Sequence, residues 1–461
     1  MISKNLIHDV LTAALSTGGD FAEVFLESTV RNSVSVVNGI CEKSVSGMDY
    51  GAGIRIFNGL GAVYVYTNDL GAENFIKIAK EAAAAVSKVN ALNTVKGFIN
   101  TEIQNRHKVV VMPDSSQKRE VVEILKRSHA ASMEYNPLVT QTSGGYADVV
   151  SNILIANSNG LWAQDLRVRS RASFAAVASN ESEKQTASLG PGACRGFEFV
   201  QGLNPYKIGR EIAETAVTML KAKEAPGGKM CVVIENGFGG VIFHEASGHS
   251  LEATSVAKNA SVFCGKMGEK IASDKVTAID DATLANEFGS INIDDEGEIT
   301  RRNVLIENGI LKSYMVDKLN GKRMNAESTA SARRESYKYA PTSRMTNTFI
   351  APGTDSQNGI ISSVDYGLYA KKMGGGSVTP ATGEFNFAVV EGYMIRGGKI
   401  AEPVRGATLI GKGSDVLLNI DMVADNLELA QGVCGSESGS VPVNVGQPMI
   451  RVKEITVGGK E

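Results

Sequence analysis

An excess of positive charge is absent from this sequence, and so is any long apolar run. Its 461 residues include 47 Lys and Arg against 50 Asp and Glu, a formal net charge of −3. Without a basic surplus there is no electrostatic footprint for a nucleic acid or a membrane surface as partner. No apolar stretch approaches the roughly 18–20 residues that cross a bilayer. The composition, 43% hydrophobic and 21% charged, is typical of a soluble globular protein.

Cysteines and aromatic residues are also few. The five cysteines are odd in number and scattered, which argues against a disulfide framework and favours a reducing cytoplasm. The first fifteen residues predict a helix rather than a signal peptide, because apolar residues recur at helical spacing and His8 and Asp9 interrupt them. We therefore expect a cytoplasmic protein.

The length predicts two or three domains, and the first half reads as helix plus antiparallel sheet. Asn58-Gly59 and Asn159-Gly160 each separate two alternating stretches, and such pairs tolerate the positive φ of a type I′ hairpin turn. We predict an N-terminal α/β domain over residues 1–224, divided into lobes of about 1–100 and 101–224.

The second half predicts a β-rich domain over residues 225–461. It follows a Pro-Gly-Gly break in "KEAPGGK", and it contains hairpin signals at Asn308-Gly309 and Gly397-Gly398. One principal helix is expected to begin near Gly239 or Gly240. The fold class is therefore α+β, with a single metal-binding helix in the C-terminal domain.

That helix carries the stretch "VIFHEASGHSLEA", residues 241–253, which resembles the zinc-protease signature H-E-x-x-H with one residue added. Five residues on an ideal helix turn through about 500°, which leaves His244 and His249 about 140° apart. A π-bulge or a break adds a residue to the turn and lets both imidazoles face one ion. We predict such a distortion near Gly248, where it costs least.

Two histidines leave a metal short of ligands, since a catalytic zinc takes about three from the protein. Cys434 lies in a predicted Gly/Ser-rich loop from which a thiolate could reach the ion, and Cys264 is nearer but reads as strand. Taken alone, Cys434 is better interpreted as a buried apolar residue. Glu245 would be the general base. A chance pair of structural histidines remains the alternative to a metal site.

Three other features admit both a functional and a structural interpretation. The acids of 293–298 could bind a hard cation, but a solvated turn is favoured. The glycines of 373–377 could bind an anion, but they lack the Lys of a P-loop, so a flexible loop is favoured. Arg333 or Arg334 could hold a substrate carboxylate, and a structural ion pair is equally expected.

Five stretches together resemble the TldD/PmbA metallopeptidases, and specifically their TldD-type subunit, along essentially the whole chain. They are "FHEASGHSLEA", "TSVAKNASVFCGKMGEKIAS", "DDEGEITRRNVLIENGILKSYMVDKLN", "RRESYKYAPTSRMTNTFIAPG" and "GVCGSESGSVPVNVGQP". The resemblance implies one Zn²⁺ per chain on His244, His249 and Cys434, with Glu245 catalytic. It also implies a homodimer, or a heterodimer with a PmbA/TldE-type partner, enclosing a cavity that admits unfolded peptides.

The sequence therefore predicts a zinc-dependent metalloprotease that hydrolyses peptide bonds of unfolded or flexible polypeptides with metal-activated water. No nucleic acid or membrane partner is expected. Two alternatives stay open. One is a non-proteolytic protein that binds or escorts peptides, and the other is a metal-dependent amidase of small molecules, whose chemistry at the carbonyl is the same.

Overall fold

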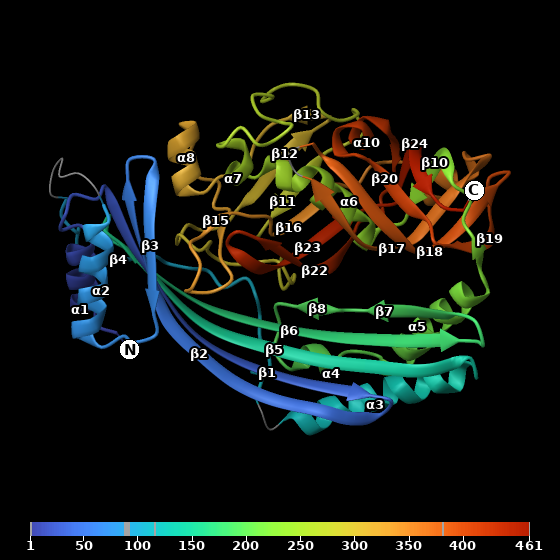
Figure 1. The fold of residues 1–461 in the computed structure, drawn as a ribbon, viewed down its shortest axis with the longest axis horizontal. Helices are drawn as coiled ribbons and strands as arrows, with labels where there is room; N and C mark the ends of the chain where they lie inside the picture. Colours follow the sequence, from blue (N-terminus) through green and yellow to red (C-terminus); the bar gives the residue numbers. More distant parts are fainter. Residues whose placement is uncertain (1, 87–92, 115–116, 380–381, 461) are drawn as a thin grey trace.

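The structure is a computed structural model that describes residues 2–86, 93–114, 117–379 and 382–460. It confirms the α+β class: a long antiparallel sheet with helices forms the N-terminal part, and a β-rich part follows (Figure 1). None of the helices in the described part of the chain could cross a membrane.

The N-terminal part is built on one eight-stranded sheet whose two long hairpins lie side by side. The first hairpin pairs with the second through β1 and β5, from Glu23 opposite Asn157 to Val37 opposite Ser143. The strand order is β3-β2-β1-β5-β6-β4, with β7 and β8 also on β6. The strands are β1 (Phe21–Val37), β2 (Ile40–Asn58), β3 (Gly61–Thr67), β4 (Ile99–Asn100), β5 (Val139–Asn157), β6 (Leu161–Ser179), β7 (Lys184–Leu189) and β8 (Gly192–Ala193).

Helices pack at both ends of this sheet and bury two separate apolar clusters. Phe75 and Ile54 belong to the cluster under the first pair of helices, and Ile212 and Phe174 to the cluster under the second pair. Figure 1 shows α1 and α2 at one end of the long strands and α3 and α5 towards the other. The helices are α1 (Lys4–Ala14), α2 (Ala72–Ala84), α3 (Lys118–Tyr135), α4 (Glu198–Gln201) and α5 (Pro205–Lys221).

The predicted hairpins are present, with one difference in the first turn. Asn58 pairs with Gly61, so the turn consists of Gly59 and Leu60 and lies one residue later than predicted. At the second hairpin Gly160 has φ +94° and joins β5 to β6. In the C-terminal part Asn308 and Gly309 both have positive φ, as the type I′ turn requires.

Eight strands of the C-terminal part form a sheet that closes on itself as a barrel. β17 pairs with β10 on one side and with β18 on the other, and β24 and β20 complete the circuit. Its strands contribute residues such as Val232, Leu368 and Phe387 to the largest apolar cluster of the described residues. The strands are β9 (Lys223–Glu224), β10 (Gly228–Ile234), β17 (Tyr366–Thr379), β18 (Glu384–Arg396), β19 (Lys399–Arg405), β20 (Thr408–Lys412), β21 (Ile420–Val423) and β24 (Ile450–Gly458).

A second sheet of six strands lies beside the barrel, in the order β13-β12-β11-β16-β23-β22 (Figure 1). Its strands are β11 (Ala278–Asp281), β12 (Arg302–Glu307), β13 (Ile310–Leu311), β16 (Asn347–Ile350), β22 (Glu428–Ser436) and β23 (Gly439–Gln447). Outside residues 237–251, the remaining elements are β14 (Ala332–Arg333), β15 (Thr342–Ser343), α7 (Ala253–Val256), α8 (Lys318–Met324), α9 (Gln357–Ser362) and α10 (Gly413–Asn419).

The acids of 293–298 do not form a solvated turn, so that prediction is wrong. Asp294, Asp295 and Glu296 are at most 1% exposed. Glu296 lies 2.5 Å from Arg55 of β2, and Asp295 lies 2.7 Å from Arg167 of β6. Asp295 and Glu296 tolerate burial because cations of the N-terminal sheet reach them, and these ion pairs join the two parts of the chain. Asp294 instead accepts hydrogen bonds from the backbone N–H groups of Glu296, Glu298 and Ala332.

The glycines of 373–377 belong to strand β17. The prediction of a flexible loop for these residues is therefore wrong. The strand pairs with β18 across them, and its register shifts between Met373 and Gly376. An added Cβ at Gly376 would stand 2.0 Å from the carbonyl oxygen of Asn386. The glycine there permits a close approach of two backbones at an irregularity of the barrel wall.

Candidate metal centre

The segment that carries the H-E-x-x-x-H motif is a short, irregular helix that begins directly after a barrel strand. β10 ends at Ile234, a single 3-10 turn covers Gly237–Gly240, and the one-turn helix α6 covers Val241–Phe243. An added Cβ at Gly240 would stand 2.4 Å from the carbonyl oxygen of Gly446 on β23. Glycine at this point lets the helix lie directly against the strand.

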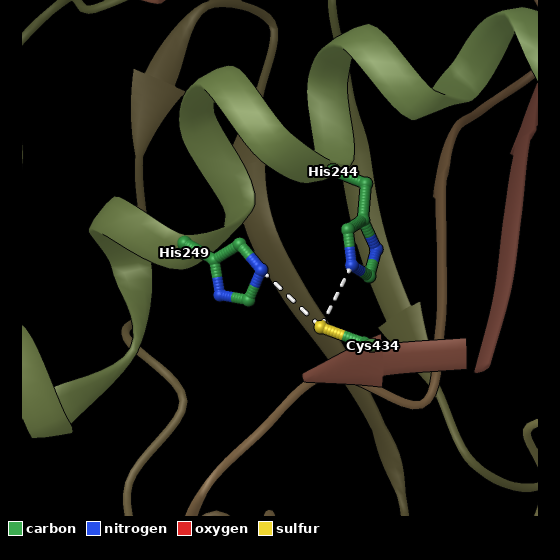
Figure 2. A group of neighbouring side chains, drawn as sticks. All are labelled: His244, His249 and Cys434. Atoms are coloured by element: carbon green, nitrogen blue, oxygen red, sulfur yellow. Dashed lines mark hydrogen bonds between the residues drawn. The ribbon is translucent and has the colours of Figure 1, made fainter. Parts of the chain in front are cut away.

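The predicted distortion is a π-helical turn over His244–Gly248. The backbone N–H of His249 donates to the carbonyl oxygen of His244, which is the i to i−5 pattern. One extra residue is therefore contained in the turn, and the two imidazole rings come to 5.3 Å between centroids. Figure 2 shows both rings directed to the same point.

Gly248 is at the predicted position but for a different reason. Its backbone angles, φ −57° and ψ −50°, are those of an ordinary helix, so the turn does not need the conformational freedom of glycine. An added Cβ would instead stand 2.4 Å from the sulfur of Met345. The residue is small because the chain packs closely beneath the motif.

Cys434 lies on strand β22 rather than in a loop, and it meets the two histidines there. Its Sγ is 3.3 Å from Nε2 of His244 and 3.2 Å from Nε2 of His249 (Figure 2). All three donor atoms lie within 4.8 Å of one another, and Cys434 is 4% exposed. β22 is the outermost strand of its sheet.

Two residues that were not predicted from the sequence hold the side chains of His249 and Cys434 in place. Glu252 is 3% exposed, and its Oε2 accepts a hydrogen bond of 3.0 Å from Nδ1 of His249. Its Oε1 accepts from the backbone N–H of Met345 at 3.3 Å. A carboxylate on Nδ1 fixes the tautomer in which Nε2 has a free lone pair.

Arg344 contacts the side of the site that contains Cys434. It is fully buried and donates to the carbonyl oxygen of Cys434 and to Gly439 at the start of β23. Its Nε is 3.9 Å from Oε1 of Glu252, so one guanidinium connects the support of His249 to the strand of Cys434. Glu252 follows the motif by three residues and could have been suspected, whereas Arg344 lies in the stretch "RRESYKYAPTSRMTNTFIAPG", whose spacing does not connect it to the motif.

The two histidines have opposite electrostatic environments. Burial lowers the pKa of His244 well below its ordinary value, and the neighbouring His249, Arg344 and Arg333 lower it further. Burial also opposes a charge on His249, but Glu252 and Cys434 outweigh it and raise its pKa well above the ordinary value. Nδ1 of His244 is buried and has no hydrogen-bond partner in the described part of the chain.

Glu245 is beside the ligand cluster but not within it. Its Oε2 is 3.6 Å from Nε2 of His249, and its side chain is 29% exposed. Burial raises its pKa, Glu252 adds to the rise, and His249 and Arg344 oppose it. A partly buried carboxyl group with a raised pKa is suited to accept and return a proton.

The remaining candidates lie elsewhere. The thiol of Cys264 is 3.6 Å from the carbonyl oxygen of Val256 and does not join the cluster. Arg334 is in a structural ion pair, with Nη2 2.9 Å from Glu23. Arg333 is buried and donates to the carbonyl oxygen of Met345 at 2.6 Å, and no described carboxylate lies within 4.0 Å of it. Arg334 therefore forms the structural ion pair that was one of the two interpretations. Arg333 forms no such ion pair with a described residue.

Comparisons with known proteins agree on one family. Family models described as PmbA/TldA metallopeptidase domain 1, central domain and C-terminal domain match residues 22–86, 112–220 and 227–459. The chain is 36% identical over 449 residues to a metalloprotease TldD homolog of Haemophilus influenzae, covering 95% of this chain and 93% of that protein. It is 33% identical over 245 residues to a zinc metalloprotease TldD homolog of Saccharolobus solfataricus, covering 53% and 54%.

Solved structures share the fold at lower identity. A Thermotoga maritima protein has a TM-score of 0.79 and 21% identity, with 99% of this chain and 100% of that chain covered. TldE from Thermococcus kodakarensis has a TM-score of 0.77 and 18% identity, with 99% of each chain covered. At these identities the similarity concerns the fold alone.

Proposed function

The chain belongs to the PmbA/TldD family of metallopeptidases, and we propose that it hydrolyses peptide bonds of unfolded or flexible polypeptides at a zinc site formed by His244, His249 and Cys434. In this proposal Glu245 is the general base. The convergence of the three donor atoms within 4.8 Å carries the proposal, because they come from positions up to 190 residues apart.

The donor set fits a zinc ion. Two imidazole nitrogens and a thiolate suit zinc or another borderline-soft metal, and three protein ligands leave a position for water or substrate. Tetrahedral bond lengths would separate a nitrogen and a sulfur donor by about 3.6 Å, and the observed distances are 3.3 and 3.2 Å. The bond between Glu252 and His249 is the support that zinc-binding histidines usually have.

The residues of the chain would divide the work of hydrolysis. A bound zinc ion would lower the pKa of water towards neutrality and polarise a peptide carbonyl group. Glu245, 3.6 Å from His249, would take a proton from the attacking water and return it to the leaving amine. Its raised pKa suits both directions of transfer. Glu252 and Arg344 would hold His249 and Cys434 without contacting substrate.

The decisive experiment combines metal analysis with digestion of an unfolded polypeptide. We expect about one zinc per chain in the wild type and in Glu245→Gln, with hydrolysis in the wild type only. Full activity of Glu245→Gln would contradict the mechanism. A stable metal-free protein that leaves the peptide intact would favour the binding or escort alternative, and cleavage of small acyl-amides alone would favour the amidase.

A partner and a location belong to the same proposal. We expect a dimer of the chain with itself or with a TldE-type partner, and the fold shared with TldE supports it. All five cysteines are free, which supports a reducing compartment such as the cytoplasm. Light scattering of the purified protein, alone and after co-expression with a TldE-type chain, measures the assembly. A monomer under both conditions would contradict this part of the proposal.

A further inference from the structure

A cavity of about 240 Å³ lies along a gap in the edge of the N-terminal sheet. β4 pairs with β6 at Leu161 and Trp162, and β8 pairs with it at Ser170 and Arg171. Between these positions no described strand covers the outer edge of β6. The cavity occupies this interval, between the sheet and the C-terminal part, because both Leu166 of β6 and Ser290 line it.

The edge of β6 offers unpaired backbone groups to the cavity. On this edge, the carbonyl oxygen of Trp162 accepts a hydrogen bond from the N–H of Thr101. The N–H of Ala172 donates to the carbonyl oxygen of Pro191. Because outward groups alternate along an antiparallel strand, the N–H and C=O groups of Leu166 and Val168 also face outwards. In the described part of the chain they have no hydrogen-bond partner, and both residues line the cavity.

The cavity also contains a cation without a counterion. Arg169 donates to the carbonyl oxygens of Phe288 and Ser290, at 3.0 and 2.9 Å. No described carboxylate lies within 4.0 Å of it, whereas its neighbour Arg167 is paired with Asp165 and Asp295. An arginine at a cavity wall that lacks an anion is suited to bind one from solution.

His107 adds a second donor beside Arg169. Its Nδ1 accepts a hydrogen bond of 3.2 Å from the backbone N–H of Asn286, so the ring proton is on Nε2. Nε2 is buried and has no partner in the described residues. Burial lowers the pKa of His107 to about 4, Arg169 lowers it next, and Asp165, which also lines the cavity, opposes both. The ring is therefore neutral.

We propose that this cavity binds the C-terminal end of an extended peptide, whose last backbone groups pair with β6 and whose carboxylate contacts Arg169 and His107. Strand addition and capture of a terminal carboxylate are both established modes of peptide recognition. The cavity has roughly the volume of eight water molecules, which leaves room for one or two C-terminal residues of a peptide. Apolar walls from Val109, Met112 and Ile291 suit an apolar last side chain.

The inference goes beyond the proposed function, because the cavity contains none of the metal ligands. A peptidase produces fragments with new carboxyl ends, so the site would retain a product or the end of a substrate. Its failure and that of the zinc mechanism are separable. Zinc content and hydrolysis report on the metal centre, and the ring signal of His107 reports on the cavity.

The test is NMR of the purified protein with ring-labelled histidine, with the His107 signal assigned through His107→Asn. N-acetyl-Ala-Val with a free carboxylate should move this signal and raise the pKa of His107 by about one unit or more, because an anion favours the charged ring. The C-terminal amide of the same dipeptide should leave the signal unchanged. An equal response to the amide, or to isovalerate alone, would overturn the peptide assignment.

Three variants complete the experiment. Arg169→Gln should weaken dipeptide binding about 10-fold or more, the loss expected for a hydrogen bond to a charged group. Arg169 also holds two carbonyl groups, so Leu166→Trp tests the site independently by filling the cavity from a side chain that is 43% exposed. Arg171→Gln, on the same strand and outside the cavity, is the matched control. Unchanged affinity in both test variants would refute the site.

Discussion

Glu252→Gln tests whether the support of His249 determines the affinity of the metal centre. In the protein, Oε1 of Glu252 accepts from the N–H of Met345 and Oε2 accepts from Nδ1 of His249. A glutamine of the same shape would keep its oxygen on the Met345 N–H, because that group only donates. Its amide NH₂ would then face Nδ1 of His249 and favour the tautomer with the proton on Nε2, the atom nearest Cys434.

The wrong tautomer has to be reversed before Nε2 can bind a metal. Loss of such a supporting carboxylate typically weakens metal binding 10- to 100-fold, which corresponds to about 1.4–2.7 kcal/mol. Zinc affinity, measured by competition with a chromophoric chelator at constant pH, is the direct assay. The metal-free variant should keep its fold, as shown by its circular dichroism, because a neutral amide replaces a charge that is 3% exposed.

A matched control and a clear negative result make the experiment decisive. Glu437→Gln removes another glutamate of the same half, which is 56% exposed and, among the described residues, pairs only with Lys258. This change should not alter the zinc affinity. If Glu252→Gln binds zinc within two-fold of the wild type, then Glu252 does not orient His249 in solution, and the tautomer reasoning is refuted.

Three further outcomes are expected. Chelation of the metal should lower the Tm of the wild type but not of Cys434→Ala, because a ligand that binds only the folded state stabilises it; an equal decrease in both would exclude Cys434. Gly240→Ala should lower the free energy of unfolding by about 1–3 kcal/mol, because its Cβ would stand 2.4 Å from the carbonyl oxygen of Gly446. Gly375→Ala is the control and should cost less, because its Cβ would have no described neighbour within 4 Å. Equal Tm values of the two variants would contradict the close-packing account. Burial raises the pKa of Asp280 from 3.8 to about 6, so this group favours folding at low pH and loses that contribution as pH rises. Asp280→Asn should therefore gain about 1.3 kcal/mol over the wild type between pH 5 and 7 in thermal unfolding, and a constant difference would refute the assignment.

Turns were the part of the fold that the sequence predicted well, because their chemistry is local. Asn308-Gly309 and Gly397-Gly398 have the positive φ that their residue types tolerate. The π-turn was predictable for a related reason, since a five-residue spacing of ligands on one helix permits few geometries. The hairpin turns and the π-helical turn of the motif could thus be predicted from short stretches of sequence.

Burial of charge could not be predicted in this way. The acids of 293–298 have the composition of a surface turn, and partners distant in the sequence, such as Arg55, 241 residues from Glu296, and Arg167 of β6, make their burial tolerable. Cys434 stands among glycines and serines that suggest a loop, yet pairing with β23 makes that stretch an edge strand. Arg344 donates to the carbonyl oxygen of Cys434 from a stretch that is distant in the sequence from both Cys434 and the H-E-x-x-x-H motif. Each of these features depends on contacts between distant parts of the chain.

The separation of the ligands along the chain has a consequence for the order of assembly. His244 and Cys434 are 190 residues apart, and β22, β23 and Arg344 must all be in place before the thiol meets the imidazoles. A partly synthesised or partly unfolded chain would contain the motif and lack the centre. Hydrolytic competence would therefore arise only when the C-terminal domain is complete, so the fold itself delays a destructive activity until the enzyme is finished.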